Sequence, residues 1–331
     1  MNQRLQLKGS IAERCSPGGL LALLLLGWLL LAWNGIAEAA TVAEASTKGS
    51  QGADYWRQVT QGSSGYSTNR SDEAGVLINR SGQEWRQLRN DKVQPYGKWA
   101  LLGTVVVLLA TYLLLGSNKL DQPRSGRTIE RWRKFDRYLH WLVAGLFIIL
   151  ALTGLSLLYG RYFLPELLGK AGFISYLQLA KSAHNYLGIL FAFALTLMLL
   201  KWFLSNIPSV TDILWFVQGG GMIKGKHPHA GYMNGGEKLW FWLLLVGGVA
   251  LVLSGLVLDF PAVIGLRDTL QDANIIHAVS ALVLVCGALA HAYIGTLGTE
   301  GALEGMLSGR VDEVWAQQHH DLWYDEVKDK K

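Results

Sequence analysis

Cysteine is scarce in this sequence, which holds only two among 331 residues. Cys15 lies in a segment expected to be removed, and Cys286 lies inside an apolar run, so the mature chain can form no disulfide framework. The motif Cys-x-x-Cys-His is absent as well. Its absence excludes covalently attached c-type haem, and two separated cysteines exclude a cysteine-ligated iron-sulfur cluster.

Charge is also scarce: 17% of the residues are charged, whereas 50% are hydrophobic and 13 are Trp. This balance is typical of membrane proteins rather than of soluble domains. The net charge of +5 does not indicate a nucleic-acid partner, because the basic residues gather beside the apolar segments.

The first apolar block differs from the later ones. Residues 20–33 follow a basic start and lead into the small-residue stretch 37–40. This order predicts a cleavable signal peptide over residues 1–39, with an uncleaved anchor as the alternative. Residues 40–98, rich in Gly, Ser, Gln and Arg, then form a periplasmic N-terminal region, in which we find no catalytic constellation.

Five longer apolar segments follow, each near the roughly 20 residues that a bilayer-spanning helix needs. They lie at 99–116, 139–159, 183–204, 239–259 and 273–297. The sequence therefore predicts an all-α membrane protein, a transmembrane helix bundle in which one extra N-terminal helix precedes four helices that carry the chemistry.

The loops between these segments give the orientation. Loop 117–138 carries seven Lys or Arg residues and the loop before residue 239 carries three, whereas the two loops on the other side carry four together. Basic residues are enriched on the cytoplasmic side. The predicted signal peptide and the distribution of basic residues both place loop 117–138 and the C-terminal tail 298–331 in the cytoplasm. The chain is therefore expected in the inner membrane of a bacterial cell.

Four of the eight histidines lie within the apolar segments or at their first turns: His140, His184, His277 and His291. An ionisable residue at membrane depth is a functional candidate, because leaving it unpaired in hydrocarbon is costly. The predicted directions of the helices place His184 and His277 near the outer face. They place His140 and His291 near the inner face.

The spacing of His277 and His291 supports two sites at different depths. Fourteen residues of helix span roughly 21 Å and return to about the same face. Two imidazoles at each depth match the axial ligands of two b-type haems, whereas a zinc site would need more ligands than two histidines. Gly188 and Gly287 lie one turn from a histidine, where they serve either a porphyrin edge or helix packing.

Residues 128–327 resemble the gamma subunit of formate dehydrogenases, a dihaem cytochrome b. The matching stretches are FDRYLHW (135–141), AHNYLG (183–188), IIHA (275–278), AHAY (290–293) and WAQQHHDLWY (315–324). Related cytochromes of hydrogenases and thiosulfate reductases share the general four-helix plan.

The resemblance implies that residues 139–297 form a four-helix dihaem domain in which His140, His184, His277 and His291 bind the haem iron. It also implies that Asn234, Gly236 and Glu237 contact quinone beside the inner haem, together with His291. Glu237 departs from the Gln of the family member compared. Without the resemblance, a glycine-rich turn capped by Asn is the simpler interpretation of this loop.

The implied activity is respiratory electron transfer to membrane quinone, either menaquinone or ubiquinone, with proton uptake from the cytoplasm. The implied partners are an alpha subunit with molybdenum or tungsten, which oxidises formate, and an iron-sulfur beta subunit. This chain supplies no catalytic residue for formate.

Two further alternatives stay open. In the first alternative the chain is the cytochrome b of a hydrogenase or thiosulfate reductase. In the second it is a proton-coupled membrane transporter. Asp259 is the one clear carboxylate in the apolar segments, which disfavours a proton pathway. His227, His229, His319 and His320 are expected to be solvated or to contact helix ends.

Overall fold

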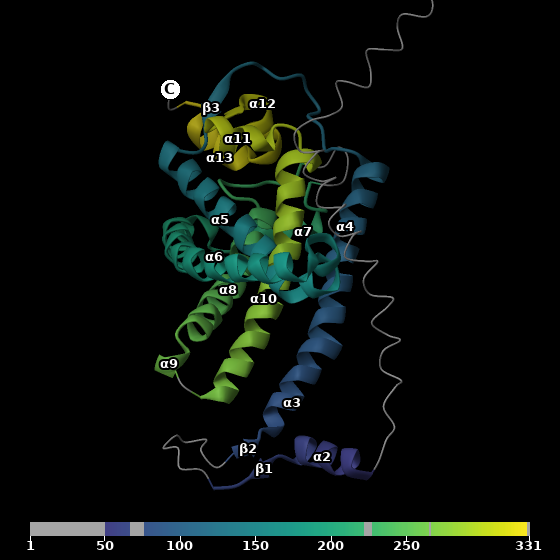
Figure 1. The fold of residues 1–331 in the computed structure, drawn as a ribbon. Coiled ribbons are helices and arrows are strands. Elements are labelled where there is room, and N and C mark those ends of the chain that lie inside the picture. Colours follow the sequence, from purple (N-terminus) through teal and green to yellow (C-terminus); the bar gives the residue numbers. More distant parts are fainter. Residues whose placement is uncertain (1–49, 67–75, 222–226, 265, 330–331) are drawn as a thin grey trace, which may run out of the picture.

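The computed structural model describes residues 50–66, 76–221, 227–264 and 266–329. The predicted signal peptide at 1–39 lies outside the described residues. Figure 1 shows a bundle of long helices with small elements gathered at each end.

Five helical segments are long and apolar enough to cross a membrane, which confirms the predicted fold class. The extra N-terminal segment consists of α3 (Arg80–Gln87), the π-helical turn η3 (Leu88–Val93) and α4 (Gln94–Leu115). The four others are α5 (Lys134–Tyr159), α6 (Leu164–Trp202), α8 (Gly235–Asp259) and α10 (Arg267–Tyr293). Short helical turns follow three of them: η4 (Gly160–Tyr162), η5 (Leu204–Asn206) and η6 (Ile294–Gly298).

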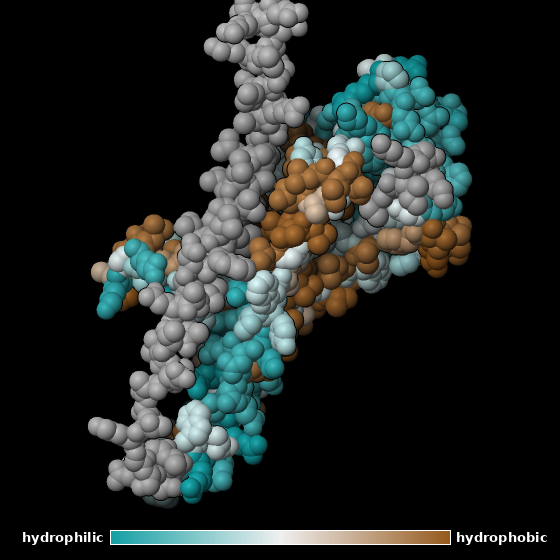
Figure 2. Space-filling model, turned by 90° about the vertical axis from the view of Figure 1, so that its right-hand side faces the viewer, coloured by the Kyte–Doolittle hydropathy of each residue, from teal (hydrophilic) through white to brown (hydrophobic). Residues whose placement is uncertain are grey.

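The core of the bundle lies between α5, α6, α8 and α10, and Leu195 and Leu284 are fully buried there. Many large apolar side chains on the outer faces of the helices are exposed, among them Leu114, Phe193 and Leu200. Figure 2 shows hydrophobic surface over the middle of the molecule, between hydrophilic ends. Such an apolar middle region is what the hydrocarbon of a bilayer requires.

The start of α6 is not straight. Gly169 has φ of 68° inside this segment, a conformation that glycine adopts without the steric cost of a side chain. The chain therefore changes direction there, and the residues before Gly169 form a separate turn of helix beside the end of α5.

The first turns of α4, the helix that precedes the four-helix domain, pack against the bundle, whereas side chains near its end, such as Leu113, are exposed. The hydroxyl of Tyr159 donates to the backbone oxygen of buried Gln94 at 2.9 Å, and the side-chain oxygen of Gln94 accepts from Arg161 at 3.0 Å. A Cβ atom on Gly97 would lie 2.4 Å from Leu282 of α10. Helix α4 is therefore part of the bundle rather than a separate anchor.

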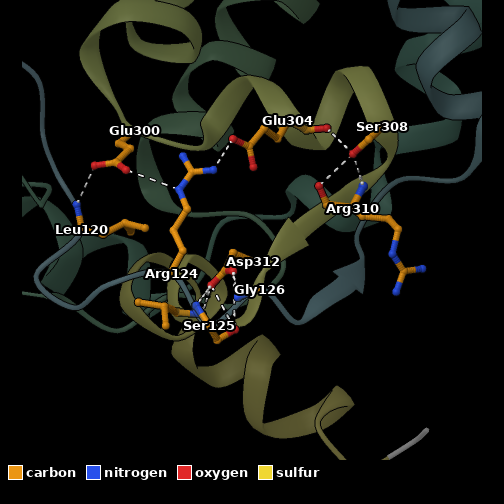
Figure 3. Close-up of polar contacts among 10 residues, drawn as sticks. Leu120, Arg124, Ser125, Gly126, Glu300, Glu304, Ser308, Arg310 and Asp312 are labelled. Atoms are coloured by element: carbon orange, nitrogen blue, oxygen red, sulfur yellow. Dashed lines mark hydrogen bonds and ion pairs between the residues drawn. The ribbon is translucent and has the colours of Figure 1, made fainter.

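The segment predicted as a C-terminal tail is folded into a cap together with loop 117–133. The cap contains β3 (Thr128–Glu130), α11 (Ala302–Ser308), β4 (Arg310–Asp312), α12 (Glu313–His319) and α13 (Asp321–Val327). Strands β3 and β4 pair antiparallel. Figure 3 shows Arg124 bonded to Glu300 and Glu304, and the Asp312 carboxylate bonded to the chain at residues 125–126.

The remaining elements lie away from the bundle core. Figure 1 places α2 (Ser50–Gln61), β1 (Ser63–Ser64), β2 (Val76–Ile78) and α9 (Pro261–Ile264) at the end opposite the cap. Ser81 of α3 hydrogen-bonds Asp268 of α10 there. Helix α7 (Val210–Val217) packs beside the N-terminus of α8.

Candidate functional site: two histidine pairs and a capped loop

The first pair consists of His184 on α6 and His277 on α10, whose ring centroids are 6.1 Å apart at an interplanar angle of 73°. The two rings come from different helices that meet at one depth. The structure thus brings together the pair that the sequence predicted from helix direction alone. This pair lies toward the end opposite the cap and is called the outer pair below.

Hydrogen bonds fix the imidazoles of the outer pair. The Oγ1 of Thr153 donates to the Ile149 carbonyl at 2.8 Å, so it accepts from His184 Nδ1, also at 2.8 Å. The Nδ1 of His277 donates to the Leu251 carbonyl at 3.0 Å. In both rings the proton sits on Nδ1, and the lone pair on Nε2 is available to a metal ion.

Two glycines make room for these rings. A Cβ atom on Gly154 of α5 would lie 3.1 Å from His184 Cε1, and one on Gly255 of α8 would lie 3.2 Å from His277 Cε1. Both distances are tighter than ordinary contacts, so a larger residue would push the imidazole aside. The sequence analysis missed both residues, because they lie on the helices that face the ligands rather than on the ligands' own helices.

The second pair, called the inner pair, consists of His140 on α5 and His291 on α10, with ring centroids 6.2 Å apart at 57°. Aromatic rings hold it: Trp240 stacks on His291 at 5.2 Å and 14°, and Trp141 meets His140 edge-on at 5.1 Å. The Nδ1 of His140 is buried and has no hydrogen-bond partner among the described residues.

The two glycines singled out in the sequence differ from each other, because one is packed against a side chain and the other faces open space. A Cβ atom on Gly287 would lie 2.6 Å from Trp240, so this glycine admits the tryptophan that stacks on His291. Nothing lies within 4 Å of such an atom on Gly188.

The geometry of both pairs fits a haem iron between two imidazoles. A metal–imidazole bond of about 2.0–2.1 Å, with the ring centre about 1.1 Å beyond the nitrogen, separates two opposed ring centres by about 6.2–6.4 Å. The separations of 6.1 and 6.2 Å in the structure lie close to this range. Among the described residues no group of three or more His, Cys, Asp or Glu is suited to a metal, which argues against a zinc-type site.

The loop before α8 forms a capping box. The side-chain oxygen of Asn234 accepts from the backbone N–H of Glu237 at 2.9 Å, and the Glu237 carboxylate accepts from the backbone N–H of Asn234 at 2.8 Å. A Cβ atom on Gly236 would lie 3.1 Å from Trp215 of α7, so a larger residue would crowd that ring. The three residues predicted to contact quinone are therefore adjacent and rigidly placed.

Glu237 also reaches into the cap. Its carboxylate accepts a hydrogen bond from Arg131 at 3.0 Å, and the side chain of Arg131 is only 2% exposed. His320 lies on the same side, with Nε2 3.8 Å from the carboxylate. Nothing in the spacing of the sequence pointed to this buried cluster.

The four remaining histidines divide into two groups. His227 pairs with Asp121 at 2.7 Å and His229 pairs with Asp321, both at the surface. His320 is 1% exposed and lies where α12 ends and α13 begins, so of the two expectations, solvation and contact with helix ends, only the second holds. Burial lowers the pKa of His319 to about 4 and lowers the pKa of His320 well below its usual value.

Comparison with known proteins identifies the family of this chain. The sequence profile described as prokaryotic cytochrome b561 matches residues 131–309. The nitrate-inducible formate dehydrogenase cytochrome b556(Fdn) subunit of Escherichia coli K12 is 29% identical over 207 residues, 61% of this chain and 93% of that protein.

Two other relatives give the same result. The formate dehydrogenase cytochrome b556 subunit of Haemophilus influenzae is 31% identical over 216 residues, 63% of this chain and 87% of that protein. The formate dehydrogenase cytochrome b556(fdo) subunit of Escherichia coli K12 is 27% identical over 205 residues, 61% of this chain and 94% of that protein.

The matched region contains all four paired histidines, the helices α5, α6, α8 and α10, and the capped loop. The extra helix α4 precedes it. The family implies haem b, and the two opposed imidazole pairs suit that group. The chain is an integral membrane protein that belongs to the prokaryotic cytochrome b561 family.

Proposed function

We propose that the chain is the cytochrome b subunit of a respiratory formate dehydrogenase and that it holds two b-type haems, one at each histidine pair. The carrying observation is the pair of imidazole separations, 6.1 and 6.2 Å, at two depths along α10. His277 and His291 are 14 residues apart on this helix, which corresponds to about 21 Å along the axis.

The protein contributes orientation and environment. When bound, haem supplies a one-electron iron couple between its two axial imidazoles. Thr153 and the Leu251 carbonyl hold the outer rings at Nδ1, and Trp240 stacks on His291 of the inner pair. Buried apolar side chains of α5, α6, α8 and α10, such as Leu195 and Leu284, fill the core of the bundle around the pairs.

The donor belongs to other chains. Relatives of this chain are named as formate dehydrogenase cytochrome b556 subunits, which supports a complex with a molybdenum- or tungsten-containing alpha subunit and an iron-sulfur beta subunit. In this proposal formate is oxidised by the alpha subunit outside the membrane. Electrons then pass through the beta subunit to the outer pair and across to the inner pair.

The orientation follows from the two ends of the molecule. A signal peptide at 1–39 places α2, β1 and β2 in the periplasm, and the end carrying α11, α12 and α13 then faces the cytoplasm. The basic residues of loop 117–138 support this direction, since they lie at the capped end. The small periplasmic elements and α3 lie on the side where the partner subunits dock.

Quinone, either menaquinone or ubiquinone, binds at the capped loop in this proposal. The capping box uses the side-chain oxygen of Asn234, so the NH2 group of Asn234 is left to donate to a quinone oxygen. Gly236 lies next to Asn234 with the Trp215 ring packed against it, and the Glu237 carboxylate is placed to hand on a proton. Quinone there accepts two electrons and takes its protons from the cytoplasm.

The test is a reduced-minus-oxidised visible spectrum with haem quantitation on the purified membrane subunit. About two b-type haems per chain are expected. His277→Ala should remove the haem of the outer pair and His291→Ala that of the inner pair, while His227→Ala, which changes an exposed histidine, should remove neither. A wild-type chain without haem would refute the electron-transfer function and favour a transporter.

The donor needs a separate measurement. Purification of the intact complex should yield subunits containing molybdenum or tungsten and iron-sulfur clusters, and formate should reduce its haems. Reduction by hydrogen instead of formate would assign the chain to the hydrogenase cytochromes.

A further inference from the structure

The centre of the cap holds a buried cation in an aromatic cage. The Arg131 guanidinium donates to the Tyr232 carbonyl at 2.9 Å and to Glu237 at 3.0 Å. Four rings surround it at 5.2 to 5.7 Å from their centroids: Trp132, Tyr232, Trp315 and Trp323. Desolvated cation–π contacts of this kind are strong, so Arg131 is stabilised even when Glu237 carries no charge.

His320 lies beside this cage with one nitrogen engaged and one free. Its Nδ1 donates to the Gly231 carbonyl at 2.8 Å, which leaves the lone pair on Nε2. The Nε2 atom is buried, has no hydrogen-bond partner among the described residues, and lies 3.8 Å from Glu237 Oε2. A movement of about 1 Å brings the two atoms to hydrogen-bond distance.

A purely structural histidine does not explain this arrangement. A buried nitrogen without a partner is unfavourable, and a core position of this size is open to an apolar residue. The free nitrogen of His320 instead faces the carboxylate of the proposed quinone loop. This orientation indicates that His320 Nε2 accepts a proton during function.

We propose that His320 and Glu237 form the proton-transfer pair of the quinone site, an inference that rests on the proposed function. A proton from the cytoplasmic side binds His320 Nε2 and gives an imidazolium. The imidazolium passes that proton to Glu237 Oε2, which restores the neutral imidazole and converts the carboxylate to an acid. The acid then releases the proton to an oxygen of the reduced quinone and becomes a carboxylate again.

The charged groups around His320 favour transfer of the proton to Glu237 over its retention on the imidazole. Arg131, Glu237 and His319 are the charged or titratable groups that face it. Burial and the nearby Arg131 cation keep the pKa of His320 low, so the imidazolium is short-lived and gives its proton to the carboxylate. The exposed pair His229 and Asp321 lies next to it at the surface, where protons enter.

The experiment uses the intact complex with its haems reduced by formate and then mixed with a water-soluble naphthoquinone. The rate of haem reoxidation is followed in a stopped-flow spectrometer from pH 6 to pH 9. His320→Asn keeps a side-chain donor for the Gly231 carbonyl, and Glu237→Gln keeps an oxygen for the capping box. His227→Asn, at the surface of the same end, is the matched control.

Both test variants should bind two haems, accept electrons from formate at the wild-type rate, and reoxidise at least about tenfold more slowly with a flattened pH profile. The control should reoxidise like the wild type. Reoxidation of His320→Asn within twofold of wild type and with the wild-type pH profile would overturn this inference alone. Equal slowing at every pH would assign a structural role to His320 and overturn it as well. Wild-type haems that quinone does not reoxidise would overturn the proposed function too.

Discussion

The outer and inner histidine pairs have nearly the same ring separation but are held by different forces. Both imidazoles of the outer pair are hydrogen-bonded at Nδ1, to Thr153 and to the Leu251 carbonyl. The inner pair is instead packed by Trp141 and Trp240, and the Nδ1 of His140 has no partner among the described residues.

This difference separates two ways of fixing a ligand. A hydrogen bond at Nδ1 sets the tautomer and makes the imidazole a stronger electron donor, whereas a stacked ring sets only its orientation. We therefore expect the haem of the outer pair to have the lower reduction potential of the two. This order of potentials would give the proposed transfer from the outer to the inner pair a favourable driving force.

The largest effect is expected from filling the space beside the outer pair. Gly154→Val places atoms where even a Cβ lies 3.1 Å from His184, so the imidazole is displaced and the outer haem is lost. Haem quantitation should fall from about two to about one per chain. Gly145→Val on the same helix is the control, because nothing lies within 4 Å of its Cβ. Full haem content in Gly154→Val would contradict the geometry.

A smaller effect is expected from removing the stacked ring of the inner pair. Trp240→Leu removes the 5.2 Å stacking on His291, and such contacts contribute about 0.5–1.5 kcal/mol, or up to about tenfold in affinity. The haem of the inner pair should be lost on dilution in detergent before that of the outer pair. Trp242→Leu on the same helix is the comparison, since Trp242 bonds the Asn206 carbonyl. Equal loss of both haems would contradict the prediction.

Removing a hydrogen bond of the outer pair is expected to shift a reduction potential without loss of haem. Thr153→Val removes the acceptor of His184 Nδ1 at almost constant volume. A less electron-rich imidazole stabilises oxidised iron less well, so the outer potential should rise while the inner potential stays fixed. Redox titration measures both values. Thr196→Val, whose hydroxyl bonds only the backbone of its own helix, should leave both potentials unchanged.

The sequence contained enough information for the bundle and the histidine pairing. Long apolar runs predict helices that cross a bilayer, and the alternating direction of those helices fixes which histidines share a depth. The structure brings together the same pairs, His184 with His277 and His140 with His291. Both predictions rest on the length and order of the apolar segments, which a single sequence records directly.

The cap and the surroundings of the ligands could not be predicted in this way. Arg124 and Glu304 are 180 residues apart, and a polar loop of varied composition gives no periodic signal for such a contact. Gly154 and Gly255 resemble ordinary helix-packing glycines until the facing histidines are placed beside them. His320 was expected to be solvated or to contact a helix end, because the groups that meet it across the cap, Gly231 and Glu237, come from a distant part of the chain.

The smallest expected effect concerns the cap, which lies beside the inner pair and far from the outer pair. Hydrogen bonding to Asp321 raises the pKa of His229 above its usual 6.5, so the pair stabilises the cap fully below pH 6.5 and loses this contribution as pH rises through the raised value. Because His229 is 71% exposed, the contribution is on the order of a few tenths of a kcal/mol. Amide exchange of residues 229–231 and 320–322 should therefore quicken slightly between pH 6 and pH 9, after correction for the intrinsic rate. His229→Gln should abolish that pH dependence and leave exchange near the outer pair unchanged, whereas a dependence that persists in the variant would assign it to another group of the cap.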